Sequence, residues 1–170
     1  GFKFDTITRN GECFDVKLKL EKGELVTAWI GDILKGVWHD LSTDGKFKGF
    51  RTLWFRVVSV DQENQKITIA SRYPDDSKYN PVQFLEVARI GSFTEESRQR
   101  SILIDSKENC ITFLDHVNTW DITPNMEVCW LGRKDRNIPG VPSTAGYNAK
   151  LSNIIMSGKI FQYDEISGTD

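Results

Sequence analysis

The residues best suited to chemistry cluster in one short stretch, IGSFTEESRQRSILID, which covers residues 90–105. Glu95 and Glu96 stand beside Arg98 and Arg100, between two apolar runs. Two carboxylates can hydrolyse a glycosidic bond when both face it and one has a raised pKa. Polar surroundings keep both acids ionised here, so we interpret the cluster as a solvated turn between two strands. Its arginines are expected to pair with Glu95, Glu96 or a neighbouring loop, as exposed ion pairs worth about 0–1 kcal/mol each that serve orientation or subunit contact.

The two histidines do not form a recognisable catalytic group. His39 and His116 each have an aspartate beside them in the sequence. Neighbours on a strand point to opposite faces, so these residues do not make a dyad. No P-loop, nucleophile-elbow, dinucleotide-binding or zinc-protease motif occurs in the sequence. We therefore expect no catalytic residue and no cofactor, and we place the histidines in loops or interfaces.

The three cysteines, Cys13, Cys110 and Cys129, are an odd number in a chain of this size, which argues against a disulfide framework. No two of them have the C-x-x-C spacing that zinc sites use, so we expect no metal. Cys110 and Cys129 lie in apolar, strand-like runs. All three are predicted to be free thiols, because free cysteine packs as a small apolar side chain.

Five tryptophans are the other candidates for ligand binding, because exposed aromatic rings can stack on sugars. Trp29, Trp54 and Trp130 lie among apolar neighbours in predicted strands, which favours core packing. Trp38 and Trp120 lie in predicted loops, and they are our candidates for a ligand or partner surface.

The composition argues against several classes of partner. The 170 residues carry a net charge of −2, and 27% of them are charged. We expect neither nucleic-acid binding nor membrane insertion, because there is no basic excess and no apolar run approaches the ~18 residues of a membrane span. The chain begins without Met and without the apolar core of a signal peptide, so we expect a piece of a longer polypeptide.

Short β-strands are the elements that must position these residues. Period-two alternation and β-branched runs predict strands at 14–20, 25–30, 50–60, 66–72, 82–90, 100–105, 110–114, 126–131 and 153–162. Residues 50–60 and 66–72 should form a hairpin around a polar turn. Helix is limited to short turns at 94–99 and 115–120. The predicted fold is therefore all-β with little helix, a multi-stranded antiparallel barrel or sandwich, in one domain or two small β subdomains.

The predicted strands divide the chain into an N-terminal β region, residues 1–90, a C-terminal β region packed with it, residues 91–163, and a polar tail, residues 164–170. Gly31 and Gly91 each follow an isoleucine at the end of an apolar strand. We expect both glycines to relieve a tight corner, where a Cβ would be costly.

The predicted last strand is apolar on both faces at Ile154, Ile155 and Met156. A strand of this kind facing water would template pairing with other chains. We therefore expect residues 153–162 to be buried, either in this domain's sheet or against a neighbouring subunit.

Several short motifs follow one another along residues 25–163. They read "IGDILKG", "GFRTLWFRVVSVD", "GSFTEESRQRSILID", "ITFLDHVNTWDI", "MEVCWLGRKDRNIPGVP" and "GYNAKLSNIIMSGKIFQYD". Their order resembles a segment of large tail-associated proteins (minor structural or tail fibre-like) of Bacteroides phages and prophages. Those proteins usually carry Gly where this chain has His116, and often Gly-Asp where it has Leu131-Gly132-Arg133.

The resemblance implies a non-enzymatic structural or host-attachment module of a virion tail, made in the bacterial cytoplasm. The implied partners are other tail-protein subunits or domains, including further copies in a homo-oligomer. A carbohydrate-binding module that contacts host surface glycans stays open as an alternative, and a polysaccharide hydrolase as a third. The candidates for a ligand or partner surface are Trp38, Arg98, Arg100, His116 and Trp120.

Overall fold

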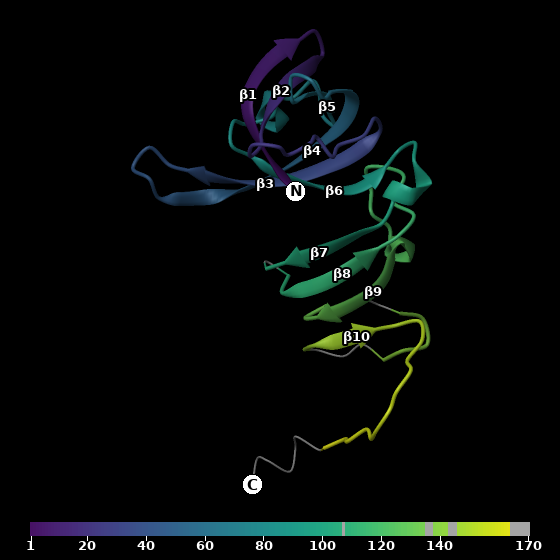
Figure 1. The fold of residues 1–170 in the computed structure, drawn as a ribbon. Coiled ribbons are helices and arrows are strands. Elements are labelled where there is room, and N and C mark those ends of the chain that lie inside the picture. Colours follow the sequence, from purple (N-terminus) through teal and green to yellow (C-terminus); the bar gives the residue numbers. More distant parts are fainter. Residues whose placement is uncertain (107, 135–137, 143–145, 164–170) are drawn as a thin grey trace.

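The structure is a computed structural model that describes residues 1–106, 108–134, 138–142 and 146–163. Antiparallel strands form a closed barrel followed by a separate four-stranded sheet (Figure 1). The barrel strands are β1 (Phe2–Asn10), β2 (Cys13–Lys19), β3 (Asp32–Leu41), β4 (Phe47–Asp61), β5 (Lys66–Ser71) and β6 (Glu86–Ser92), in the order β1-β2-β5-β4-β3-β6. The prediction of an antiparallel all-β fold is confirmed, and of its two alternatives, barrel or sandwich, the structure contains the barrel.

The second sheet extends away from the barrel, and the C-terminal part of the chain leaves it (Figure 1). It contains β7 (Ser101–Asp105), β8 (Cys110–Leu114), β9 (Glu127–Gly132) and β10 (Asn148–Lys150), in the order β10-β9-β8-β7. The only helical elements among the described residues are short 3₁₀ turns, which are η1 (Ser77–Tyr79), η2 (Glu96–Arg98) and η3 (Pro124–Met126).

The chain passes between the two sheets after Ser92, and the expected boundary at 90/91 falls inside β6. The expected polar tail, residues 164–170, lies outside the described residues.

The hairpin of β4 and β5 builds much of the barrel core, and its prediction is confirmed. Alternate side chains of β4, at Leu53, Phe55 and Val57, point into the barrel and are fully buried. Ile67 and Ile69 of β5 are buried beside them. A closed barrel has one interior, so each strand needs apolar residues at every second position only.

One predicted strand before β4 is wrong. Residues 25–30 form no strand, although Val26 and Ala28 point inward and are buried, as a strand pattern requires. β3 already pairs with β4 and β6, so no strand edge remains there for this segment. The segment bonds to a side chain instead, since Val26 N donates to Gln62 Oε1 at 3.0 Å. Trp29, expected in the core, is consequently exposed.

Other boundaries also differ from the sequence prediction. The strand over 153–162 is absent, and residues 151–163 have no regular structure and are exposed. The helical turn expected at 115–120 is absent too, whereas η3 follows a few residues later and begins at Pro124, which presets its backbone. The sequence analysis also missed β1 and β3, whose mixed polar and apolar residues gave a weak periodic signal.

The two glycine corners are tight, as predicted. Gly31 has a φ of +90°, and a Cβ there would overlap the side chain of Thr94. A Cβ at Gly91 would overlap the backbone and side chain of Val117. Both corners lie where the barrel meets the loops of the second sheet, so glycine permits the close approach of these parts.

A small apolar cluster joins the barrel to the second sheet. Ile33 of β3 and Ile90 of β6 meet Leu114 of β8 and Val117, and all four are buried. A hydrogen bond from Ser92 N to Val117 O, at 3.0 Å, crosses the same junction. The covered face of the second sheet therefore shares a core with the end of the barrel.

Candidate functional site

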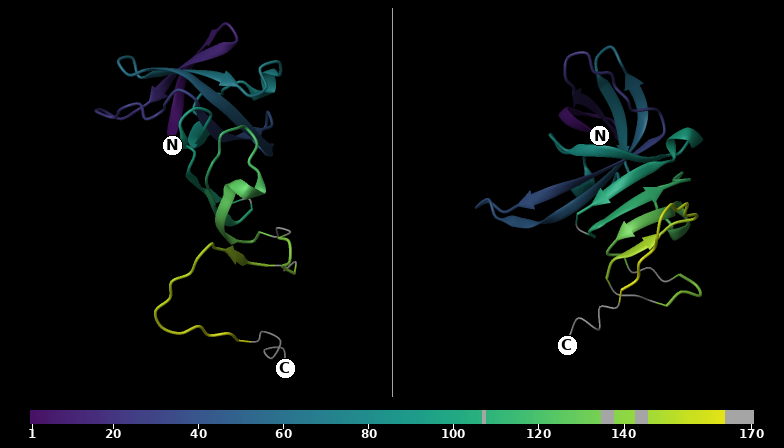
Figure 2. Two further views of the ribbon diagram at one scale, coloured as in Figure 1. Left: turned by 90° about the vertical axis from the view of Figure 1, so that its right-hand side faces the viewer. Right: turned by 60° about the horizontal axis from the view of Figure 1, so that its bottom comes forward.

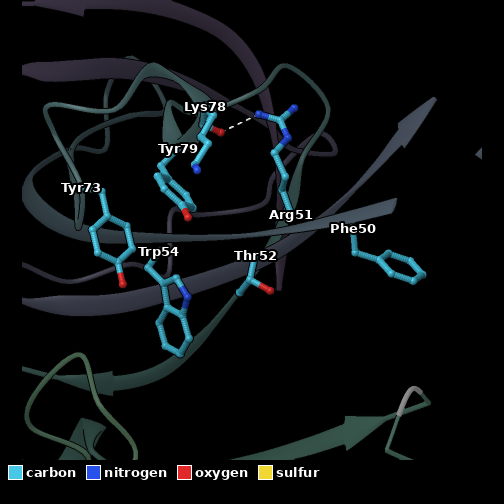
Figure 3. A pocket seen from close by; sticks show the side chains of 7 residues that line it. All are labelled: Phe50, Arg51, Thr52, Trp54, Tyr73, Lys78 and Tyr79. Atoms are coloured by element: carbon cyan, nitrogen blue, oxygen red, sulfur yellow. Dashed lines mark hydrogen bonds between the residues drawn. The ribbon is translucent and has the colours of Figure 1, made fainter. Parts of the chain in front are cut away.

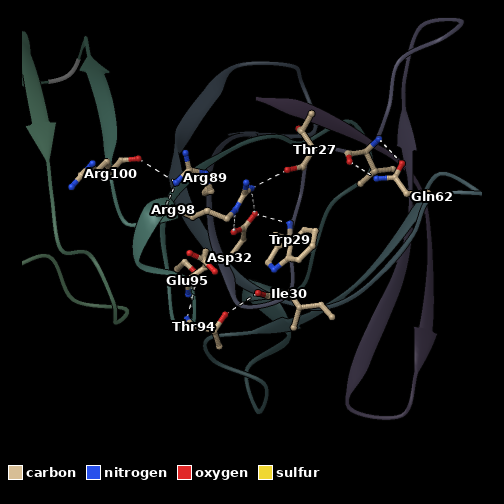
Figure 4. A network of polar contacts seen from close by, with 12 residues as sticks. Thr27, Trp29, Ile30, Asp32, Gln62, Arg89, Thr94, Glu95, Arg98 and Arg100 are labelled. Carbon is tan, nitrogen blue, oxygen red and sulfur yellow. Dashed lines mark hydrogen bonds and ion pairs between the residues drawn. The ribbon is translucent and has the colours of Figure 1, made fainter.

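The arginines of the charged cluster belong to a polar network at the end of the barrel (Figure 4). Asp32, at the start of β3, is fully buried. Arg98 donates from Nε and Nη2 to the two carboxylate oxygens of Asp32, each at 2.7 Å. Arg98 also donates to Thr27 O at 2.9 Å, and Trp29 N donates to Asp32 Oδ2 at 2.8 Å. The network therefore holds residues 27–29 against the barrel.

Of the expected partners of Arg98, the neighbouring loop is found, at Thr27, whereas the carboxylate is that of Asp32 and not of either glutamate. Glu95 caps η2 instead, because its side chain accepts from Ser97 N. The hydrogen bonds to Asp32 raise the pKa of Arg98 above its usual value, so the guanidinium stays charged. Burial, followed by the nearby charge of Arg98, lowers the pKa of Arg89, which donates to the carbonyls of Arg98 and Arg100. This part of the predicted exposed turn is in fact a partly buried connection.

Arg100 lies at the edge of this network and has a different partner. Its Nε donates to Asp115 Oδ1 at 3.3 Å, next to His116. Burial of Asp115 acts to raise its pKa, but the backbone N–H of His116 and the charges of His116 and Arg100 outweigh it and lower the pKa below 3.8. His116 is exposed, and its backbone N donates to Asp115 Oδ1 at 2.7 Å. Among the described residues, no nucleophile joins this group.

The two tryptophans expected at a binding surface are both partly buried. Trp38 lies in β3, not in a loop, and packs against the barrel core. Trp120 packs against the cluster that joins the two sheets, and its ring stands edge-on to Phe93 at 5.0 Å between centroids. The structure does not bring the five predicted surface residues together. Arg98 lies at the barrel end, and the two tryptophans lie within packed clusters. Arg100 directly precedes β7 and reaches Asp115, which neighbours His116 in the turn after β8.

An open pocket of about 410 Å³ lies elsewhere, beside β4 (Figure 3). It is lined by Phe50, Arg51, Thr52, Trp54, Tyr73, Lys78 and Tyr79. β4 pairs with β5 only from Phe55 onward, so along that edge residues 50–54 face the loop 72–80, while their other edge pairs with β3. The loop is attached by hydrogen bonds from Arg72 N to Trp54 O at 3.0 Å and from Arg51 Nη1 to Lys78 O at 2.5 Å.

The pocket combines aromatic rings with paired charges. The rings of Tyr73 and Tyr79 lie 4.6 Å apart between centroids, and Arg72 lies over both Tyr73 and Trp54. Its cations are each paired with an aspartate: Arg51 with Asp40, Arg72 with Asp121 and Lys78 with Asp76. The local charge is therefore nearly balanced, and a polyanion would gain little. The sequence signal for this pocket was the pair of tyrosines around the Pro-Asp-Asp turn, which the sequence analysis missed.

The outer face of the second sheet is apolar, and the described residues leave it exposed. Its side chains are Ile102 and Ile104 of β7, Ile111 and Phe113 of β8, and Leu131 of β9, and we call this set the apolar face. Register places them side by side, because Ile102 pairs with Phe113, and Ile104 with Ile111, which pairs with Leu131. All five are between 37% and 80% exposed, so this face contrasts with a solvated sheet face, which normally carries polar residues.

The opposite face of the same sheet contains a buried ion pair that the sequence analysis did not predict. Lys134 Nζ donates to Glu127 Oε1 and to Thr112 Oγ1, both at 2.9 Å. A buried charge needs such a partner, because an unpaired one would cost several kcal/mol. The pair closes the covered face with polar groups that are hydrogen-bonded to one another.

No group of three or more His, Cys, Asp or Glu side chains that could hold a metal ion occurs among the described residues. The three cysteines are free thiols, as predicted. Within the same residues, no helix is long and apolar enough to cross a membrane.

Comparison with known proteins identifies no relative: no family model matches the chain, and neither does any curated protein or solved structure.

Proposed function

We propose that the chain is a non-enzymatic structural module of a phage or prophage tail protein, with a role in tail architecture and presentation to the host surface. The observation that carries the proposal is the pair of uncovered apolar surfaces at its C-terminal side. One is the apolar face, and the other is the exposed chain of residues 151–163, which we call the C-terminal segment. Contiguous exposed apolar patches of this kind mark protein–protein contacts.

Two further features support this role. The order of motifs along residues 25–163 resembles tail-associated proteins. At His116, where those proteins usually carry Gly, the backbone has a φ of +59°, in the left-handed region that glycine adopts at least cost. The charged cluster at 90–105 also links parts of the chain to one another, which favours architecture over catalysis.

The test is the location of the chain in phage particles. Antibodies raised against the purified 170-residue chain should label tails by immunogold electron microscopy, in particles of the phage or lysogen that encodes it. Labelling of capsids alone, or of no particle, would contradict the tail assignment. Turnover of a host polysaccharide by the purified chain would contradict the non-enzymatic role.

A second candidate function is contact with a host surface glycan, and the pocket beside β4 favours it. Sugar rings present C–H faces to aromatic side chains and hydroxyls to polar groups, and Tyr73, Tyr79 and Trp54 stand beside Arg51 and Lys78. Because each cation there has an aspartate partner, the expected ligand is a glycan of uncharged sugars.

A glycan array tests this second function with three variants of the intact chain. Tyr73→Ala and Lys78→Ala should each weaken binding to neutral glycans about tenfold or more. Tyr147→Ala is the matched control, an exposed tyrosine outside the pocket, and should bind as the unmodified chain does. An array without a bound neutral glycan, or equal losses in all three variants, would reject the pocket as a glycan site.

A further inference from the structure

We propose that the C-terminal segment of one copy of this chain packs on the apolar face of a second copy. The inference rests on the proposed structural role and deepens it by naming the partner. The C-terminal segment is the donor and the apolar face is the acceptor, and every copy carries both.

The C-terminal segment is as rich in apolar residues as a buried strand, yet its side chains are exposed. Its apolar side chains are Leu151, Ile154, Ile155, Met156, Ile160, Phe161 and Tyr163, and they are between 48% and 101% exposed. Among the described residues, no backbone hydrogen bond joins the segment to a strand. The segment leaves β10 and runs away from both sheets (Figure 2). Within the described chain, the apolar side chains of the segment are therefore about half exposed or more, and its backbone is not bonded to a strand.

The acceptor spans three strands without interruption. Two rows of paired residues cross it, one through Ile102 and Phe113 and the other through Ile104, Ile111 and Leu131. The second row continues to Ala149 of β10, which pairs with Leu131. The apolar face is thus a continuous surface that begins beside the strand from which the segment departs.

The dimensions of donor and acceptor match. Residues 151–163 reach about 43 Å when extended. Four neighbouring strands spaced about 4.8 Å apart span about 14 Å, so the segment is long enough to cross the whole face. It also retains spare length to reach from one copy to the next.

A second copy is favoured over an unrelated partner because both unsatisfied surfaces belong to the same chain. When each copy donates its segment and accepts another, a closed ring of copies covers both surfaces in every member. An unrelated partner would have to supply both an apolar strand and an apolar face to achieve the same burial. Packing of the segment on its own sheet is the competing arrangement, and the experiment separates the two.

Disulfide trapping between copies tests the contact directly. Cys13 and Cys129 are first replaced by Ser, so that only the buried Cys110 remains. A chain with Ile155→Cys is then mixed with a larger, tagged chain with Ile104→Cys, under mild oxidation. The proposal predicts a cross-linked product that contains one chain of each size. A tagged chain with Leu41→Cys, an exposed apolar position on the barrel, should give little product.

The outcome that overturns the proposal is equally definite. Equal yields with Ile104→Cys and Leu41→Cys would show random collision. A bridge that forms only inside a double variant, Ile104→Cys with Ile155→Cys, would show that the segment folds onto its own sheet.

Charge substitutions give an independent measure. Ile155→Asp and Ile104→Asp should each weaken self-association about tenfold or more in sedimentation, because each removes a buried apolar side chain from the contact. Both side chains are largely exposed within one chain, so neither change should unfold it. Leu41→Asp is the control and should associate normally, and equal effects of all three variants would reject the contact. If the antibodies label tails but the chain stays monomeric, only this inference is rejected. If the disulfide forms between copies but no tail is labelled, only the tail assignment is rejected.

Discussion

The barrel and the second sheet use similar strands but differ in how far their apolar side chains are buried. In the barrel, Leu53, Phe55 and Val57 of β4 face a closed interior and are fully buried. In the second sheet, both faces of β8 carry large apolar residues, and only the face with Leu114 is covered, whereas Phe113 stays exposed. Closure completes the burial of a sheet within one chain, while an open sheet needs another layer. The difference leaves the barrel with a closed apolar core and the second sheet with one exposed apolar face.

The largest expected effect compares one phenylalanine from each region. Phe55→Ala should destabilise the chain by about 3–5 kcal/mol, because Phe55 is fully buried in the barrel core. Phe113→Ala, at 40% exposure on the apolar face, should cost about 1 kcal/mol or less in the monomer. Urea unfolding at low protein concentration measures both. Equal losses of unfolding free energy would mean that Phe113 contributes as much to stability as Phe55, so that the two regions do not differ.

The next effect concerns the connection between the two regions. Asp32→Asn should destabilise the chain by about 2–3 kcal/mol, because it leaves Arg98 without its buried carboxylate partner. Asp40→Asn is the matched control, since the pair of Asp40 with Arg51 is about 30% exposed and should be worth less than about 1 kcal/mol. Thermal unfolding of the two variants decides the ranking, and a larger loss from Asp40→Asn would reverse our assignment of the main connection.

A smaller effect is expected at the turn after β8. His116 has a positive φ of 59°, where a side chain costs free energy and glycine does not. His116→Gly should therefore stabilise the chain, by up to about 1 kcal/mol, in chemical denaturation. A loss of stability would show that the exposed imidazole makes a contact that outweighs the strain.

The smallest effect is a pH dependence at the same turn. The pKa of Asp115 is lowered below 3.8, so this carboxylate adds stability above its unfolded pKa and loses it as the pH falls through the folded value. Asp115→Asn should remove this contribution, leaving a shallower fall in stability below about pH 4. The side chain is partly exposed, so the difference should stay below about 1 kcal/mol. Unfolding curves at about pH 3 and pH 7 measure it, and an unchanged slope would contradict the assignment.

The sequence predicted the elements whose signals were local and consistent. The alternation over β4 and β5 and the polar turn between them were sufficient for the hairpin, and the repeated Ile-Gly context located both tight corners. Residues 25–30 have the composition of a strand, but strand formation depends on a free neighbouring edge, which β3 does not offer. The sequence of one strand does not carry that information.

The site was harder to predict than the fold for a related reason. Arg98 was recognised as a candidate, but its partner Asp32 lies 66 residues away in the sequence. The pocket depends on where pairing between β4 and β5 stops, which decides that Tyr73 and Tyr79 face Trp54. The apolar run at 154–156 was expected to be buried in a strand, yet it forms no strand and is exposed within the described chain.

The central claim is that copies of this chain join through the C-terminal segment while the barrel folds without it. Sedimentation equilibrium of the 170-residue chain and of a chain ending at Lys150 tests it most directly. The account predicts self-association of the full chain, a monomeric shortened chain, and thermal midpoints that agree within about 2 °C. A full chain that stays monomeric at about 100 μM, or a shortened chain that associates equally well, would contradict it.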